Sequence, residues 1–147
     1  MNYPDAIDPD MVGEYSALAK SGAGYFYDHV LEYRVWCHPE RGAPDKYDGE
    51  DYYYAFASYS EALDFSTSIA GAEEPLALIR QLEWVNEPEE GVLVHEKGER
   101  IAEWRVEWLS DGPRKLGDIE TFIQQHYAKC RVVGLSIKWQ GKDPASA

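Results

Sequence analysis

The sequence predicts a single α+β domain with a ferredoxin-like fold and one additional long strand near its N-terminus. From residue 52 onward, runs with strand-like alternation and runs with helical spacing follow one another as strand, helix, strand, strand, helix, strand. This is the order of a split βαβ fold. Because right-handed crossovers place both helices on the same side, we expect a mixed, mainly antiparallel sheet with two helices on one face.

Composition limits the size and the class of the protein. Its 147 residues, 44% hydrophobic and 14% aromatic, suffice to bury one core, so residues 1–147 are expected to form one domain. The 27 Asp and Glu against 14 Lys and Arg give a formal net charge of -13, which repels nucleic-acid phosphates and anionic lipids. We therefore expect no nucleic-acid partner and no membrane partner.

The N-terminal sequence and the cysteines are typical of a cytoplasmic protein. No run approaches the roughly 20 apolar residues that a membrane-spanning helix needs, and MNYPDAIDPD lacks the basic and apolar regions of a secretion signal. Cys37 and Cys130 are far apart and have no CxxC spacing. In a reducing cytoplasm we expect both to remain thiols.

The first third of the chain is expected to hold a helical segment, a long strand and a loop. Asp8 and Pro9 are a typical helix start, within a helical segment over residues 1–23. Residues 25–37 alternate between an apolar face and a face that carries charged side chains. Residues 38–51 have the proline, glycine and charge content of a loop, which is either a lid over a binding site or simply mobile.

The rest of the chain is expected to form the two βαβ units. Alternation predicts strands over residues 52–57, 76–85, 92–95, 101–109 and 133–139. Helical spacing predicts helices over residues 58–70 and 117–127, the first capped by Ser58 and Glu61 and ended by Gly71. We expect the hairpin between the third and fourth strands to turn at residues 96–99, and residues 140–147 to be a flexible tail.

Cys37 and His38 are the candidates for a catalytic role. A thiolate beside an imidazole can act as a nucleophile, because positive neighbours lower the pKa of a cysteine. Neighbouring residues on a strand point to opposite faces, however, so the two side chains meet only if the chain bends between them. The alternative is a buried cysteine beside a loop histidine.

Charged side chains in the strands form the candidate ligand-binding group. On a solvated sheet face they would form cross-strand ion pairs, each contributing fractions of a kcal/mol. If a second subunit or the N-terminal segment closes this face, the arginines would line a pocket for a carboxylate or phosphate ligand. The second interpretation predicts a homodimer that binds a small anionic ligand through Arg34, Arg80, Arg105 and Glu107.

No metal site and no resident cofactor are predicted. His126 and Cys130 have the spacing of a zinc-ligand pair, but no second pair supports them, and the acidic residues 45–51 lack the order of a calcium loop. The segment from Lys20 to Gly24 has two glycines that either cradle a phosphate or end a helix. Because it precedes a predicted strand, the helix end is the favoured interpretation.

Three segments, YRVWCHPERGAPD, YYYAFASYSEAL and EKGERIAEWRVEWL, resemble a family of small, uncharacterised bacterial proteins. Some members are labelled GNAT-type N-acetyltransferases. The resemblance implies acetyl-CoA as cofactor, bound by a Q/R-x-x-G-x-G/A loop that opens a helix. Residues 19–24, AKSGAG, are the nearest match; they lack the initial Gln or Arg and precede a predicted strand, so no site residue carries over.

Three functions remain open from the sequence. The first is a small cytoplasmic, homodimeric module that binds a small ligand or a protein partner. The second is an acyl-CoA-dependent enzyme similar to N-acetyltransferases, with its substrate beneath the loop over residues 38–51. The third is a scaffold protein without a ligand, in which the three arginines are separately paired.

Overall fold

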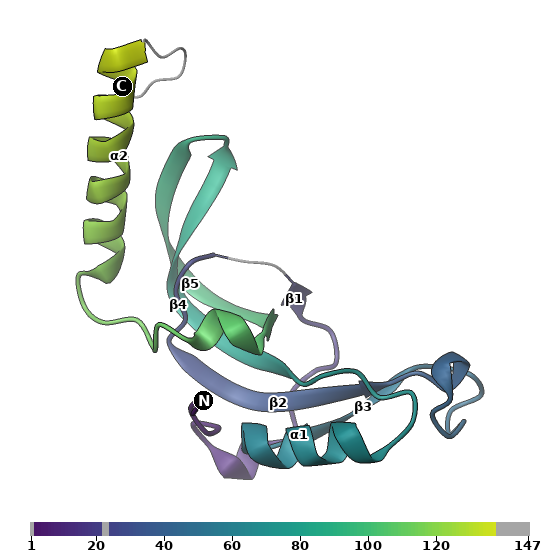
Figure 1. Ribbon diagram of the computed structural model, residues 1–147. Coiled ribbons are helices and arrows are strands. Elements are labelled where there is room, and N and C mark those ends of the chain that lie inside the picture. Colours follow the sequence, from purple (N-terminus) through teal and green to yellow (C-terminus); the bar gives the residue numbers. More distant parts are fainter. Residues whose placement is uncertain (1, 22–23, 138–147) are drawn as a thin grey trace.

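The computed structural model describes residues 2–21 and 24–137, with side-chain environments up to residue 127. It is an α+β fold with a mixed five-stranded sheet and two α-helices (Figure 1). The strands are β1 (Lys20–Ser21), β2 (His29–Cys37), β3 (Tyr52–Phe56), β4 (Leu76–Glu89) and β5 (Val92–Arg105). The helices are α1 (Tyr59–Ser68) and α2 (Asp118–Ile137), and short 3-10 turns form η1 (Pro9–Met11), η2 (Pro39–Arg41) and η3 (Val106–Leu109).

The sheet is built on the long hairpin of β4 and β5. The strand order is β1-β5-β4-β2-β3, in which β1 is parallel to β5 and the remaining neighbours are antiparallel. The hairpin turns at Gly91, which has a φ of 81°, rather than at residues 96–99 as predicted. Gly98 instead lies where the register shifts by a residue, so it accommodates a bulge within β5.

One of the two expected βαβ units is present. β3 and β4 are both antiparallel to β2 and lie on either side of it, so they are parallel to each other and α1 connects them. The second unit needed a strand over residues 133–139. That prediction is wrong for residues 133–137, which continue α2, and residues 138 and 139 lie outside the described part. The ferredoxin-like topology is therefore not confirmed.

The long second helix has a simple physical cause. Between its start at Asp118 and Val133 the sequence contains neither glycine nor proline. Extending a formed helix adds one hydrogen bond for each residue fixed, whereas a new strand needs a free sheet edge beside it. Alternation of Val133, Leu135 and Ile137 alone does not overcome that advantage.

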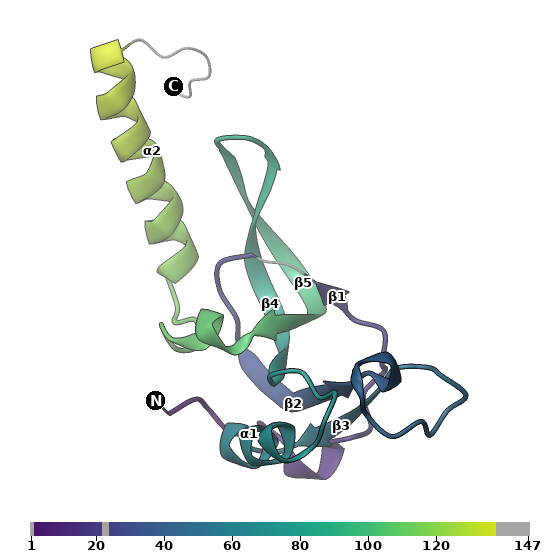
Figure 2. The same cartoon turned by 45° about the vertical axis from the view of Figure 1, so that its right-hand side comes forward.

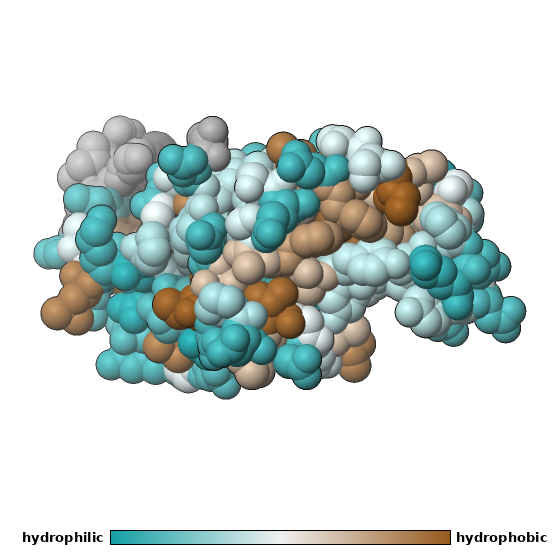
Figure 3. Space-filling model, turned by 90° about the horizontal axis from the view of Figure 1, so that it is seen from below, coloured by the Kyte–Doolittle hydropathy of each residue, from teal (hydrophilic) through white to brown (hydrophobic). Residues whose placement is uncertain are grey.

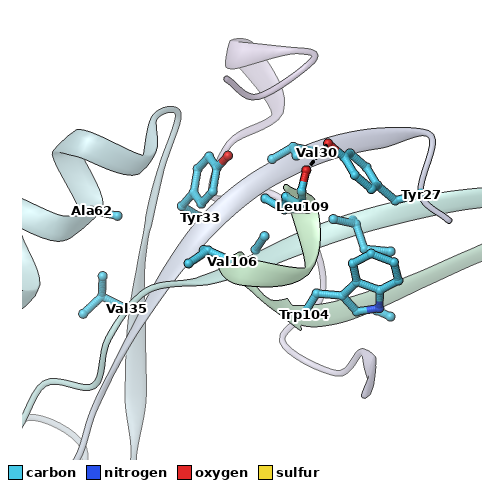
Figure 4. Close-up of a cluster of buried hydrophobic side chains, with 11 residues drawn as sticks. Tyr27, Val30, Tyr33, Val35, Ala62, Trp104, Val106 and Leu109 are labelled. Carbon is cyan, nitrogen blue, oxygen red and sulfur yellow. Dashed lines mark hydrogen bonds between the residues drawn. The ribbon is translucent and has the colours of Figure 1, made fainter. Parts of the chain in front are cut away.

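The main core lies between the sheet and a cover made of α1 and η3 (Figure 4). It contains buried residues from all three long strands, with Ala62 of α1 and Leu109 of η3 packed onto them. The start of α1 is as predicted, since the Ser58 hydroxyl accepts a hydrogen bond from the amide of Glu61 at 3.2 Å. Gly71 follows the helix with a φ of 77°. The predicted Ser58 cap is confirmed, but Gly71 does not end the helix as predicted, because α1 ends at Ser68 with Ile69, in an extended conformation, as its C-cap.

The opposite sheet face is covered by the N-terminal segment. The stretch expected to be helical forms a single 3-10 turn, η1, capped by Asp8. Residues 13–18 then cross the charged side of β2 without regular structure and lead into β1. We call residues 13–18 the strap.

The second helix packs against the far half of the hairpin. Figures 1 and 2 show α2 standing beside the ends of β4 and β5, away from the main core. Val85 and Leu93 of the hairpin and Ile119 of α2 form the buried centre of this contact. Within the described residues, no helix is both long enough and apolar enough to cross a membrane.

Candidate functional site

Arg34 lies in a closed ionic cluster beneath the strap. Its side chain is fully buried, and its guanidinium donates to Glu32 at 2.7 Å, to Glu103 at 3.1 Å and to the carbonyl of Ser16 at 2.6 Å. The charge also lies 4.4 Å from the ring centre of Tyr53. Burying a charge requires such pairing. The donors of Arg34 are therefore engaged by the protein itself.

The strap supplies the remaining partners of this cluster. The amide of Gly13 donates to Glu32 at 2.8 Å, and the Tyr53 hydroxyl donates to the carbonyl of Tyr15 at 3.3 Å. The indole of Trp36 donates to Glu103 at 2.9 Å. The sequence allows the charged face of β2 to be solvated, or to be covered by a second subunit or by the N-terminal segment. The strap, which belongs to the N-terminal segment, covers it.

Arg80 and Arg105 are paired separately from Arg34. Arg80 donates to His29 at 3.2 Å and lies 3.7 Å from Glu99. Arg105 is 66% exposed and lies 3.6 Å from Glu107. The structure thus brings Arg105 and Glu107 together, but it gives each of the three arginines a different carboxylate. Their role in binding a ligand stays a prediction.

Cys37 and His38 face different surroundings. Cys37 is buried beside Ala43 and Tyr52, and burial raises the pKa of its thiol. Burial alone would lower the pKa of His38, but hydrogen bonds and charges of Asp51 and Glu73 outweigh it and raise that pKa. Among the contacts of the described residues, neither side chain bonds to the other. This geometry lacks the proximity and the lowered thiol pKa that a nucleophilic pair needs.

A cavity of about 400 Å³ lies at η3, on the far side of β5 from the strap residues that bind Arg34. Its lining comes from two segments, the chain that leads into β2 and the chain that leaves β5. The lining residues are Gly24, Tyr25, Trp104, Glu107, Trp108, Ser110 and Asp111. We call this cavity the aromatic cleft. A second hollow of about 240 Å³ adjoins it at Gly24 and Tyr25.

Three aromatic side chains wall the aromatic cleft. Trp104 is 2% exposed, whereas Trp108 is 44% and Tyr25 51% exposed. The two indoles meet edge to face, with ring centres 5.7 Å apart. The Nε1 of Trp104 is buried and has no hydrogen-bond acceptor among the described residues. An unpaired buried donor costs about 1–3 kcal/mol in the folded protein.

Carboxylates make the aromatic cleft negative. Glu107 and Asp111 line it, and among the described residues Glu107 has only the exposed Arg105 as an ion-pair partner. In the adjoining hollow, Glu87 accepts from the Tyr25 hydroxyl at 3.4 Å. Burial, together with Glu87, raises the pKa of Tyr25, so this hydroxyl stays a neutral donor at neutral pH. A positively charged ligand fits this field.

Gly24 explains how the chain passes so close to the hairpin. Its φ is 91°, and a Cβ at this position would lie 2.7 Å from the side-chain nitrogens of both Gln81 and Arg100. A glycine at this position therefore lets the backbone lie close to the side chains of Gln81 on β4 and Arg100 on β5. Lys20 and Ser21 form β1 rather than a helix end, and residues 22 and 23 lie outside the described part. The predicted helix end at this segment is wrong.

The strand predicted over residues 101–109 contains Trp104 and Trp108, but the prediction does not place them in this cleft. Alternation through residue 109 would put both indoles on the buried face. In the structure β5 ends at Arg105 and η3 follows, which turns Trp108 toward solvent. The following Ser110, Asp111 and Gly112 are turn residues, which agree with the predicted end at residue 109, so they do not indicate the earlier end at Arg105.

No protein-family model, curated protein or solved structure matches the chain. The functional assignment therefore depends on the chemistry of the site itself.

Proposed function

We propose that the protein binds a small organic cation in the aromatic cleft. The observation that carries the proposal is a cavity walled by the exposed aromatic side chains of Trp108 and Tyr25 that also presents two carboxylates. A cavity of about 400 Å³ is within the usual size range for small-molecule sites.

The side chains specify the chemistry of the ligand. The faces of Trp108 and Tyr25 attract a cation, an interaction of about 0.5–2 kcal/mol that depends on desolvation. Glu107 and Asp111 line the cleft and balance the positive charge. The ligand class is thus an amine or quaternary ammonium compound.

Choline and its neutral analogue 3,3-dimethylbutanol test this proposal. The two molecules have the same shape and the same hydroxyl, and they differ in charge. We expect choline at millimolar concentration to raise the melting temperature of the full chain more than the analogue does, because a ligand that binds only the folded state stabilises it. Calorimetric titration should give one site for each chain.

Two variants and one control locate the site. Trp108→Ala should abolish the choline effect, and Tyr25→Ala should weaken it because a second aromatic face is lost. Tyr47→Ala removes an aromatic side chain that is 59% exposed on the loop between β2 and β3, so it should leave choline binding unchanged. Equal shifts with choline and its analogue, or an unchanged shift in Trp108→Ala, would overturn the proposal.

The same assay separates the two other functions that the sequence left open. Acetyl-CoA should raise the melting temperature if the protein is an acyltransferase, and in that case Trp108→Ala should not remove the effect. A scaffold without a ligand should respond to neither compound. The predicted cytoplasmic location and the predicted anionic ligand remain to be tested independently of this cleft.

A further inference from the structure

We propose that Glu83, His95 and Glu120 form a binding site for a divalent transition-metal ion. The three residues come from β4, β5 and α2, and one ligand atom from each lies within 4.8 Å of the other two. This cluster is separate from the aromatic cleft and shares no residue with it.

The hairpin and the helix contact place these side chains together. His95 pairs in register with Val85, so Glu83, two residues earlier, lies on the same side of the hairpin. Packing of Ile119 against Val85 and Leu93 brings the next residue, Glu120, to the histidine. The imidazole Nε2 lies 2.7 Å from Glu83, and Nδ1 lies 3.8 Å from Glu120.

The donor set is suited to zinc and its neighbours in the first transition row. One imidazole nitrogen and two carboxylate oxygens bind such ions at about 2.0–2.2 Å, and water fills the remaining positions. Ligand atoms on one ion are thus at most about 4.4 Å apart. Glu83 lies at Nε2 of His95 and Glu120 at Nδ1, so one of the two carboxylates must turn toward the nitrogen that binds the ion. Glu120 is 64% exposed, which leaves its side chain free to do so.

Charge balance also favours a divalent ion. A neutral imidazole with two carboxylates carries two negative charges, and a divalent ion neutralises them. Arg114 lies 3.7 Å from Glu83 but 2.8 Å from Asp28, which already balances it.

The test uses the full chain after EDTA treatment and gel filtration. Addition of Zn²⁺ or Co²⁺ should raise the melting temperature, Mg²⁺ should not, and Co²⁺ should produce a visible absorption band from an N/O-ligated ion. Metal analysis after a second gel filtration should find one ion for each chain. EDTA should reverse all three effects.

The variants distinguish this site from adventitious binding. His95→Asn and Glu120→Gln should each weaken Zn²⁺ binding by at least about tenfold, since changes around a site that keep the ligands already cost that much. His29→Asn, which alters a histidine on β2 that contacts Arg80, is the matched control and should bind as the unmodified protein does. An undiminished Co²⁺ band in both ligand variants, or no zinc effect in the unmodified protein, would overturn the proposal.

Discussion

Arg34 and Arg105 show how strongly the surroundings of one residue type determine its energetic role. Both leave the sheet on the same face, since each pairs in register with Leu76. The strap closes over the first, which is fully buried among carboxylates, whereas the second is 66% exposed. Sequence alone predicts the shared face but not the difference in burial.

This contrast gives a prediction for stability. Arg34→Ala leaves Glu32 buried without its partner and should lower the free energy of unfolding by about 3–5 kcal/mol. Arg105→Ala breaks an exposed ion pair and should change it by less than about 0.5 kcal/mol. Urea unfolding of the two variants measures both values. Similar losses in the two would show that the strap does not exclude water from Arg34.

His38 predicts a dependence of stability on pH. Its pKa is raised in the folded state by Asp51 and Glu73, against the opposing effect of burial. A raised folded-state pKa stabilises the protein fully below the unfolded pKa of about 6.5, and that stabilisation is lost as pH rises through the folded value. The difference in unfolding free energy between the unmodified protein and His38→Asn should therefore be larger at about pH 5.5 than at about pH 8.5.

The two carboxylates provide the control for this prediction. In the double variant Asp51→Asn, Glu73→Gln, the same His38→Asn substitution should no longer cost more at about pH 5.5 than at about pH 8.5, because burial, which lowers the histidine pKa, then acts without the two carboxylates. Chemical denaturation at both pH values measures the comparison. A pH-independent difference in the unmodified background would contradict the assigned ion pairs.

At the scale of elements, Gly71 joins the end of α1 to the loop after β2. A Cβ at this position would lie 2.3 Å from the backbone nitrogen of Ala43 and 2.8 Å from the carbonyl oxygen of His38. The amide of His38 in turn donates to the Gly71 carbonyl at 2.9 Å. Helix, loop and strand therefore meet at a contact between backbones.

Gly71→Ala should destabilise the protein much more than Gly49→Ala. Both glycines have positive φ, at 77° and 85°, so both substitutions incur a backbone cost of roughly 1–2 kcal/mol. At Gly49 no atom lies within 4 Å of the new methyl group, whereas at Gly71 the backbone of Ala43 must move. Thermal unfolding of the two variants provides the comparison. Equal destabilisation would mean that the contact at Ala43 relaxes at no cost.

Local signals predicted the elements better than their ends. The Ser58 cap, the strand at residues 52–57 and the start of α2 near residue 117 follow from short patterns, and the structure contains them within a residue or two. The strand end at Arg105 and the continuation of α2 depend on what packs nearby. Because the strand end at Arg105 was not predicted, the aromatic cleft was not predicted either: Trp108 lines it only because β5 ends before that residue.

At the scale of the whole molecule, the α+β class and a mixed sheet were predictable, but the strand order was not. The first predicted βαβ unit, β3–α1–β4, is present. The second would need a strand after α2, and the described residues contain none there. The strand order depends on contacts between residues far apart in the sequence. The pairing of β1 with β5, for example, joins Ser21 to Glu103, and no short sequence pattern predicts it.

The predicted homodimer is tested at this scale. The dimer was predicted because the charged face of the sheet has to be shielded from solvent. In the structure the strap contacts Glu32 and Arg34 on that face. Figure 3 shows the surface seen from below as a patchwork in which hydrophobic side chains lie between hydrophilic ones. Light scattering coupled to gel filtration should give twice the chain mass of 16.7 kDa for a dimer. A mass of one chain at all concentrations would exclude it.

The strap also fixes an order of events during synthesis. Ser21 pairs with Glu103, which leaves the ribosome roughly 80 residues later, at about 5–20 residues per second. For several seconds Arg34 has emerged without one of its carboxylates, and the nascent chain cannot close its sheet. The strand β1 is thus translated before its partner β5 and can take its position in the sheet only after β5 has emerged.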